Sequence, residues 1–323
     1  MQRRLTGGSG GLGARGSAAL VALLAIIAMF AAAASARAGI EIEPRDGSGA
    51  MEPHEIRQER RVVLVTGSTG GLGREVALRL AATGAHVIVH GRSEERGREV
   101  VAEIEGSGVG SARFYAADLA SFAEVRELAE TIKRDYDRLD VLVNNAGIWL
   151  NQGGRQLSSD GHEMHFQVNY LSGYLLTRML LPLLVESAPS RIVNVASGAQ
   201  APIDFDDVMM ERTYSGSRAY AQSKLAQILF TVDLAEEFTD DGVTAVSLHP
   251  ATLMATDMVR EAGMQPRSTV DEGADAVMQA ITSPEVESGQ YFNGLQAGRP
   301  NAQAQDAAAR ARLRELSERL VGR

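Results

Sequence analysis

Tyr220 and Lys224 lie four residues apart in a stretch, residues 219–238, whose composition is typical of a helix. On a helix the positions i and i+4 share one face, so the phenol and the ammonium would be neighbours. A tyrosine ionises at about pH 10, and a nearby cation favours its phenolate form. We therefore expect Lys224 to lower the pKa of Tyr220 and make it an acid and base catalyst at neutral pH. The alternative is a surface pair that shares this spacing by chance.

The scarcity of lysine favours the catalytic interpretation. Of the 32 Lys and Arg residues in the chain, only Lys133 and Lys224 are lysine. A lysine at this position suggests a need that the bulky, planar guanidinium of arginine would not meet.

Composition excludes several other classes of function. The chain has 323 residues, of which 45% are hydrophobic, so it can bury a large core. A net charge of −9 and an aromatic content of 5% argue against a nucleic-acid-binding protein. The absence of cysteine excludes disulfides, thiolate nucleophiles and cysteine-based metal sites. His162 and His165 have helical spacing, but no third plausible ligand accompanies them, so we expect no metal site.

The N-terminal segment has the features of an export signal. Arginines precede an uncharged apolar run at residues 18–34, and small residues follow where cleavage would occur. We expect residues 1–38 to direct export to the periplasm or outside the cell. An uncleaved membrane anchor that contacts the bilayer through residues 18–36, or a mis-assigned start and a cytoplasmic product, are the alternatives. Residues 39–58 are expected to form a linker.

A glycine pattern within this segment is a decoy. Residues 6–13 fit the same T-G-x-x-x-G-x-G pattern as residues 66–73. A phosphate-binding glycine loop needs a strand before it and a helix after it, and only five residues precede Thr6. We assign no cofactor role to the first copy.

From residue 59 to 323 the chain alternates strands and helices. The apolar run at residues 62–65 is typical of a strand buried on both faces of a parallel sheet. The alternation predicts one α/β domain, a Rossmann-type doubly wound parallel sheet with helices on both faces. The expected strands are residues 62–65, 86–89, 113–117, 139–143, 191–195, 244–248 and 290–293, and the expected helices are near residues 75–82, 121–137, 164–185, 219–238, 271 onward and 302–320.

The second glycine pattern stands in the required context. It follows the first strand directly and precedes a helix, so Gly67 would permit a tight turn, Gly71 would let backbone approach a pyrophosphate, and Gly73 would allow close helix packing. The helix N-terminus would hold the anion. The loop residues that we expect to bind a dinucleotide are Thr66, Gly67, Ser68, Thr69, Gly71, Leu72 and Gly73.

The end of the second strand indicates which dinucleotide is bound. Specificity for NAD needs an acid there to hold the ribose hydroxyls, and the sequence has His90-Gly91-Arg92 instead. Arg92 offers a planar cation for a 2′-phosphate. We therefore expect NADP(H) in preference to NAD(H), the alternative being a solvated arginine at a helix start.

Three later strand ends also carry polar residues. Asp118, before Leu119, could meet the adenine amine or could simply begin a turn. The stretch Asn144-Asn145-Ala146-Gly147 is either a turn or a cofactor contact at the carboxyl edge of the sheet. Ser197 ends a further strand, and the long loop at residues 198–217 separates it from Tyr220; such loops are usually functional. Asn169 lies in a strongly apolar helix, where its amide must be hydrogen-bonded.

Together, and in this order, these motifs resemble a short-chain dehydrogenase/reductase, over about residues 60–320. The stretches FQVNY at residues 166–170, RIVNVAS at 191–197, QSKLA at 222–226 and His249-Pro250 are most similar to the retinol-dehydrogenase-like branch. That branch tends to carry an arginine after the second strand and to prefer NADP(H).

The resemblance implies a role for each matching residue. Tyr220 would donate or accept the proton on the substrate oxygen, and Ser197 would hydrogen-bond that oxygen. Lys224 would lower the pKa of Tyr220 and bind the nicotinamide ribose, while Asn169 would hold a water that links Lys224 to solvent. The other residues that the resemblance places at the cofactor are Asp118, Leu119, Asn145, Ala146, Gly147, Pro250 and Thr256.

The sequence departs from the family pattern at Ala251, where the family usually has glycine, and this makes the role of Thr256 less certain. An exported enzyme would also need its NADP(H) to be regenerated outside the cytoplasm, and no partner that could do this is evident. The expected export therefore conflicts with steady turnover of substrate.

The predicted function is an oxidoreductase that moves hydride between NADP(H) and an alcohol, ketone or aldehyde. Met254, Met258, Met264, Ile148 and Trp149 suggest an apolar pocket mouth and a lipophilic substrate. The alternatives are a non-catalytic NADP(H)-binding sensor or scaffold, and an epimerase or dehydratase of the same fold. The long helices at residues 164–185 and 219–238 are where a homo-oligomer would pair.

Overall fold

The computed structural model describes residues 60–150 and 153–322. The predicted export signal at residues 1–38, the linker at residues 39–58 and the decoy glycine pattern lie outside the described residues, and they remain predictions.

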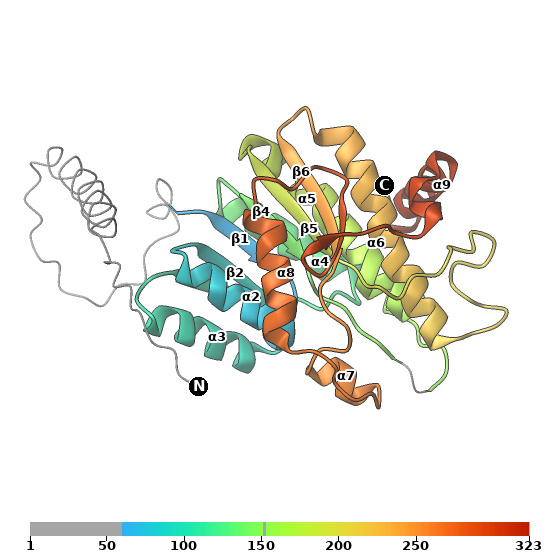
Figure 1. Cartoon of the computed structure of the whole chain (residues 1–323), viewed down its shortest axis with the longest axis horizontal. Coiled ribbons are helices and arrows are strands. Elements are labelled where there is room, and N and C mark those ends of the chain that lie inside the picture. The colour runs from blue at the N-terminus through green and yellow to red at the C-terminus, as the bar shows by residue number, and fades with distance from the viewer. Residues whose placement is uncertain (1–59, 151–152, 323) are drawn as a thin grey trace, which may run out of the picture. The chain divides into compact units, whose positions relative to one another are not determined.

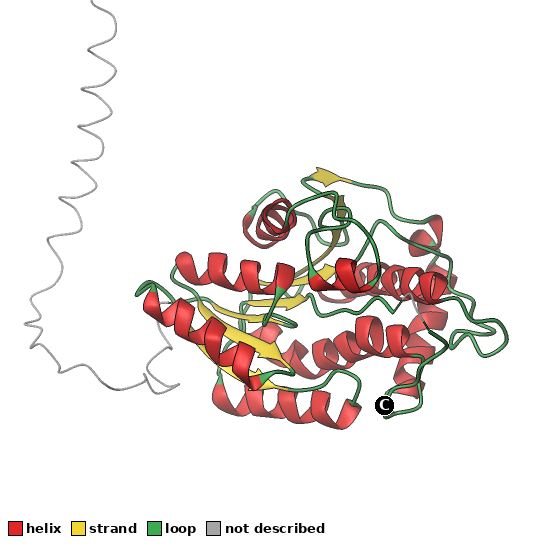
Figure 2. Cartoon of the chain, turned by 90° about the horizontal axis from the view of Figure 1, so that it is seen from below, coloured by secondary structure: helices red, strands yellow, loops and turns green. Residues whose placement is uncertain are grey.

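The described residues form a single mixed sheet with helices on both faces, as predicted (Figure 1, Figure 2). The strand order is β3-β2-β1-β4-β5-β6-β7-β8, and every neighbouring pair is parallel except β7 with β8. The order reverses between β1 and β4, which in a doubly wound sheet is where a ligand binds. The strands are β1 (Val62–Val65), β2 (His86–Gly91), β3 (Ser111–Ala116), β4 (Val141–Asn144), β5 (Ser190–Val195), β6 (Val243–His249), β7 (Tyr291–Asn293) and β8 (Gln296–Ala297).

The helices follow the predicted alternation. They are α2 (Gly71–Ala82), α3 (Glu94–Gly106), α4 (Phe122–Asp135), the π-helical turn η1 (Phe166–Leu171), α5 (Ser172–Glu186), α6 (Gly216–Phe238), α7 (Asp257–Glu261), α8 (Val270–Thr282), the 3₁₀ turn η2 (Ala302–Gln305) and α9 (Ala307–Leu320). Neither α7 nor β8 is among the predicted elements. Both elements are too short to show a periodic pattern.

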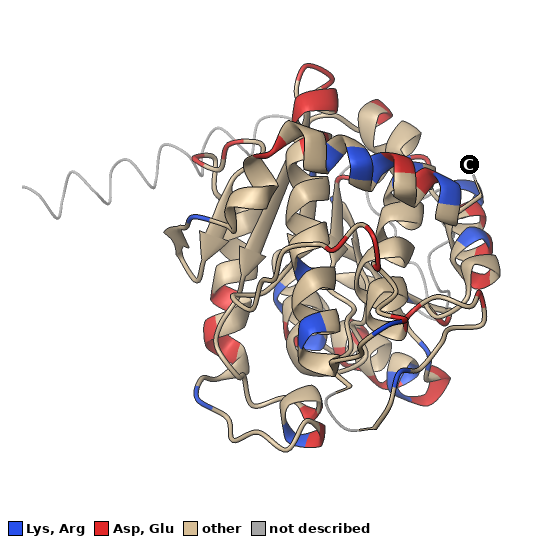
Figure 3. Ribbon diagram, turned by 90° about the vertical axis from the view of Figure 1, so that its right-hand side faces the viewer, with Lys and Arg blue, Asp and Glu red and all other residues tan. Residues whose placement is uncertain are grey.

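Successive side chains of each strand enter two separate cores. In β1, Val62 and Leu64 join the core beneath α4, α5 and α6, whereas Val63 and Val65 join the core beneath α2 and α8. This alternation is the period of two of a β-strand, and because both faces are covered the strand reads as a continuous apolar run. Acidic and basic residues are interspersed over the outer helices (Figure 3).

One described helical stretch, Phe166–Glu186, is long and apolar enough to cross a membrane by length and hydropathy. Two thirds of it is buried inside the protein, with Tyr170 and Tyr174 among the largest fully buried side chains. It is therefore a core helix of the protein. Because most of its circumference is buried, apolar residues occur on all of its sides.

The C-terminal helix α9 is held against α6 by a buried ion cluster. The guanidinium of Arg310 donates to Asp233 over 3.1 Å, both side chains are less than a tenth exposed, and Arg314 donates to the other carboxylate oxygen over 3.2 Å. This part of α6 is therefore covered by α9 of the same chain. The pairing of two copies through α5 and α6 remains a prediction, and it would have to use the rest of their surfaces.

We expect Asp233→Asn to lower the free energy of unfolding by about 1–3 kcal/mol, because it removes the buried carboxylate that Arg310 binds and leaves this guanidinium only the mostly exposed Glu236. Asp206→Asn is the matched control, since its partner Arg312 and Asp206 itself are mostly exposed and such pairs contribute about 0–1 kcal/mol. Urea denaturation of the two variants measures the difference. Equal unfolding midpoints would show that the cluster does not hold α9.

Candidate functional site

The predicted glycine loop lies where β1 passes into α2. Gly67 and Gly71 have φ of 65° and 51°, which other residues rarely adopt. A Cβ on Gly73 would lie 2.4 Å from the carbonyl oxygen of Gly67, so the loop can close onto the helix only with glycine there. The N-cap of α2, Gly70, provides no side-chain hydrogen bond. The first N–H groups of this helix are therefore available to an anion such as a pyrophosphate.

Two side chains fix the loop to the end of β4. Thr66 Oγ1 accepts the N–H groups of Asn145 and Ala146, both over 3.0 Å. The amide of Asn145 donates back to the carbonyl oxygens of Thr66 and Gly67, over 2.8 and 3.3 Å. These bonds join the two strands at which the sheet order reverses, so Asn145 acts here as a structural clamp beside the expected cofactor.

His90 lies in β2 and contacts this loop, a role that its place in the sequence did not predict. Its Nδ1 accepts the N–H of Gly67 over 3.1 Å, and its backbone exchanges hydrogen bonds with Ser68. Burial lowers the pKa of His90 to about 4, so at neutral pH the ring is uncharged and Nδ1 remains an acceptor. The sequence places His90 one residue before Gly91. No pattern in the neighbouring residues indicates that its ring binds the backbone of Gly67.

Arg92 lies at the end of β2, as predicted, and its side chain is 73% exposed. Its guanidinium is 3.9 Å from the carboxylate of Asp118, close enough for a weak ion pair. Asp118 Oδ1 also accepts the N–H of Ala120 over 2.9 Å, so Asp118 does begin the turn into α4. An exposed, weakly paired guanidinium is free to turn toward a phosphate.

The other predicted cofactor residues occupy the same edge of the sheet. Thr69 lies against Gly91, and the methyl group of Thr256 would be 3.2 Å from a Cβ on Gly71. A Cβ on Gly147 would be 3.3 Å from Lys224 Nζ. Leu72 and Leu119 are buried in the two cores, and Pro250 is buried at the end of β6.

Tyr220 and Ser197 are brought together across the long loop that separates them in the sequence. Tyr220 lies in the first turns of α6 and is half-buried, and Ser197, which follows β5, is the polar neighbour that acts on its pKa. Burial raises the pKa of Tyr220, and the hydroxyl group of Ser197 only partly opposes this. The phenol is therefore protonated at neutral pH.

The prediction that Lys224 lowers the pKa of Tyr220 is wrong for this structure. Lys224 Nζ is 5.8 Å from the centre of the tyrosine ring and donates instead to Val195 O over 2.9 Å and to Gln227 Oε1 over 3.0 Å. Burial lowers the pKa of Lys224 itself to about 7, because none of the carboxylates in residues 60–150 and 153–322 compensates for its desolvation. The i, i+4 spacing correctly predicted that Tyr220 and Lys224 lie close together, but it could not show how deeply the ammonium group is buried.

Asn169 is fully hydrogen-bonded, as its place in an apolar helix requires. It accepts the N–H of Ile148 over 2.7 Å and donates to Ile148 O and to Ser223 Oγ over 3.1 and 3.0 Å. It belongs to the π-helical turn η1, a deformation that often marks functional sites. The water that Asn169 was expected to hold remains a prediction.

The packing also shows the surroundings of four further side chains near the site. Met254 is half-buried and packs against the core beneath α2 and α8, with its sulfur beside Gly273, and the apolar pocket mouth remains a prediction. Tyr214, whose spacing to Arg218 imitates the catalytic motif, donates its phenol proton to Glu163 over 3.3 Å. His165 binds the same carboxylate, over 2.7 Å, whereas the ring of His162 lies against Phe122.

Known proteins resemble this chain over most of its length. A family profile described as short chain dehydrogenase matches residues 61–267. Retinol dehydrogenase 13 from Mus musculus is 35% identical over 296 residues, which cover 85% of this chain and 88% of the relative. Retinol dehydrogenase 14 from Homo sapiens is 37% identical, with 81% and 86% covered, and polyprenol dehydrogenase from Mus musculus is also 37% identical, with 82% and 85% covered.

Solved structures agree with this relationship. A protein from Mycobacterium paratuberculosis superimposes with a TM-score of 0.68 at 29% identity, covering 81% of this chain and 93% of that one. A short chain dehydrogenase from Shigella flexneri, solved in complex with NADP, has a TM-score of 0.58 at 26% identity, covering 73% and 97%. The chain therefore belongs to the short-chain dehydrogenase family, in its retinol-dehydrogenase-like branch, and it is a nicotinamide-dependent oxidoreductase that acts on a small-molecule substrate.

Proposed function

We propose that this protein transfers hydride between NADP(H) and the carbonyl or carbinol carbon of a lipophilic substrate, with Tyr220 as the proton donor or acceptor. The observation that carries the proposal is the placing of Tyr220 beside Ser197, with the buried Lys224 one turn away, at the same sheet edge as the glycine loop. A protein that only bound a nucleotide would have no need of these proton-handling groups.

The residues at this edge fit a dinucleotide. The uncapped N-terminus of α2 would hold the pyrophosphate, Arg92 would hold a 2′-phosphate, and Lys224 would bind the nicotinamide ribose. Bound NADPH supplies the hydride for carbonyl reduction. Ser197 would hydrogen-bond the substrate oxygen and orient it. Tyr220, whose raised pKa keeps it protonated, would then give that oxygen its proton.

Two observations support a lipophilic substrate. Retinol and polyprenol, which appear in the names of the relatives, are long apolar alcohols. In this chain the ring of Trp149 lies against Tyr220, with 5.5 Å between their centres, so one wall beside the proton donor is aromatic.

Turnover is tested with the protein from residue 39 onward, mixed with NADPH and aldehydes and ketones of rising chain length. Loss of NADPH absorbance that becomes faster with apolar chain length is the expected result. Binding of NADPH without consumption across the panel would favour the sensor or scaffold alternative. Conversion of a hydroxylated substrate without net NADPH consumption would favour an epimerase or dehydratase.

We expect Arg92→Ala to weaken NADPH binding about 10- to 100-fold, because a charge-assisted hydrogen bond contributes about 1.5–3 kcal/mol. Binding of NADH, which has no 2′-phosphate, should be unchanged. Nucleotide fluorescence titration measures both dissociation constants. Arg96→Ala, in the first turn of α3, is the matched control and should leave both unchanged. An equal loss of affinity for both nucleotides in Arg92→Ala would mean that Arg92 does not select between them.

A further inference from the structure

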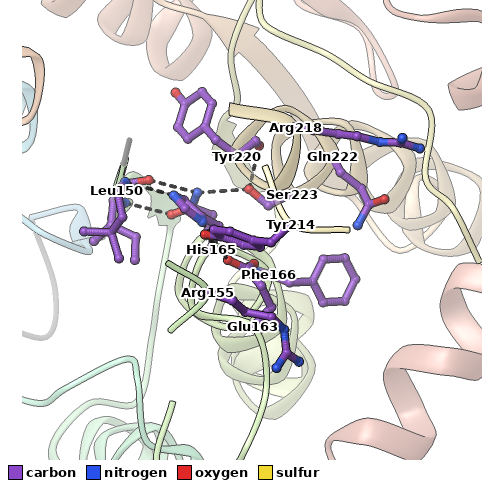
Figure 4. Close-up of polar contacts among 12 residues, drawn as sticks. Leu150, Arg155, Glu163, His165, Phe166, Tyr214, Arg218, Tyr220, Gln222 and Ser223 are labelled. Carbon is purple, nitrogen blue, oxygen red and sulfur yellow. Dashed lines mark hydrogen bonds and ion pairs between the residues drawn. The ribbon is translucent and has the colours of Figure 1, made fainter. Parts of the chain in front are cut away.

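The segment at residues 148–150, which follows β4, is held by two side chains of one helical turn (Figure 4). Ile148 N–H donates to Asn169 Oδ1 over 2.7 Å, and Leu150 N–H donates to His165 Nε2 over 2.9 Å. His165 and Asn169 lie at i and i+4, so they present their acceptors on the same face. The segment is thus fixed on both sides of Trp149.

The hydrogen bonds that hold residues 148–150 place the ring of Trp149 next to the proposed proton donor, Tyr220, where it forms one wall of the substrate site. Its ring is 5.5 Å from that of Tyr220 and tilted by 33°, and the ring of His165 meets Tyr220 edge-on at 6.3 Å. A shift of the segment would therefore change the space beside the Tyr220 phenol.

The bond from Leu150 determines the tautomer of His165. Because Nε2 accepts a backbone N–H, it carries no proton, and the ring proton must lie on Nδ1. Nδ1 is 2.7 Å from Glu163 Oε1, so it donates to that carboxylate. A carboxylate partner that fixes the tautomer and orientation of a histidine is a recurrent device at functional sites.

Glu163 is equipped to remain a charged partner although it is only 1% exposed. Its second oxygen accepts the N–H of Phe166 over 2.8 Å, and the phenol of Tyr214 donates to the first over 3.3 Å. Burial alone would raise the pKa of Glu163, but the bonds from His165 and Phe166 outweigh it and the pKa is lowered. Through Tyr214, the carboxylate also contacts the long loop that leads into the Tyr220 helix.

We propose that Glu163 and His165 are positioning residues, which hold residues 148–150 and thereby set the Trp149 wall of the substrate site against Tyr220. This inference rests on the proposed function, because it assumes that the substrate lies beside Tyr220. A pair that only stabilised the fold would leave the position of Trp149 unaffected.

The test compares His165→Leu, which removes the acceptor, with His165→Gln, whose amide can restore an acceptor near the position of Nε2. Trp149 is the only tryptophan of the chain, so its fluorescence reports on this segment without any substrate. In His165→Leu the emission should shift to the red and acrylamide should quench it more strongly. The kcat/KM for a long-chain carbonyl should fall about 100-fold, as expected when a reacting group is misplaced by about 1 Å. NADPH binding should be unchanged, and His165→Gln should recover most of both losses.

The matched control is His162→Gln, which alters a histidine three residues away whose ring packs against Phe122, and it should keep wild-type fluorescence and kinetics. A folded His165→Leu variant with wild-type fluorescence would overturn the proposal. If no carbonyl is turned over by any form of the protein, the proposed function fails while the fluorescence comparison still decides this inference.

If His165→Leu does not fold, the proposal can be tested on the wild-type protein by NMR. Nitrogen-15 chemical shifts of its histidine rings, assigned with the His165→Gln spectrum, should show the Nδ1-protonated tautomer for His165. The Nε2-protonated tautomer would contradict the bond from Leu150 and with it the proposal.

Discussion

Tyr220→Phe is expected to lower kcat for carbonyl reduction about 1,000-fold, within the range of about 10²–10⁴ that general acid catalysis contributes. The substitution removes only the phenolic oxygen. The ring that packs against Trp149 and His165 remains, so substrate and NADPH binding should be preserved. Steady-state kinetics with a reactive aldehyde and NADPH titration measure the two quantities separately.

Tyr115→Phe is the control for this variant. Its hydroxyl donates to Asp135 over 2.8 Å, in a different part of the protein, so its removal should cost about 1 kcal/mol of stability and no activity. If Tyr220→Phe kept more than about a tenth of wild-type kcat, well above what loss of a general acid leaves, another group would have to supply the proton.

Gly73→Ala is expected to weaken NADPH binding about 10- to 100-fold, because overpacking costs about 1–3 kcal/mol. The added methyl group would lie 2.4 Å from the backbone oxygen of Gly67 and 2.4 Å from the amide nitrogen of Asn145. The Gly67 oxygen belongs to the backbone, and the Asn145 amide, although it ends a side chain, is held in place by its bonds to Thr66 and Gly67. The loop would have to open, and the N–H groups of α2 would lose their arrangement.

Gly70→Ala is the matched control in the same loop. A Cβ on Gly70 would meet nothing within 4 Å, and its φ of −171° is extended backbone that any residue adopts. Fluorescence titration with NADPH, with a thermal melt of each variant, tests the pair. Equal dissociation constants for the two variants would show that close packing at Gly73 does not shape the nucleotide site.

The sequence by itself determined the parts that depend on local backbone. The apolar runs of β1 and β4, the glycine pattern at residues 66–73 and the pairing of Tyr220 with Lys224 each occupy a few consecutive residues. Strand period, glycine conformation and helical spacing act over that range. For this reason the sheet, its helices and the edge that carries the candidate site could all be predicted.

The tertiary structure decided what depends on burial and on partners distant in the sequence. The pKa of Tyr220 is raised and that of Lys224 is lowered because both groups are desolvated, which no spacing reveals. His90 reaches back 23 residues to Gly67, and His165 finds its partner in the backbone of a loop 15 residues away. A local pattern cannot specify such contacts, because they form only when the packed sheet brings separate segments to one edge.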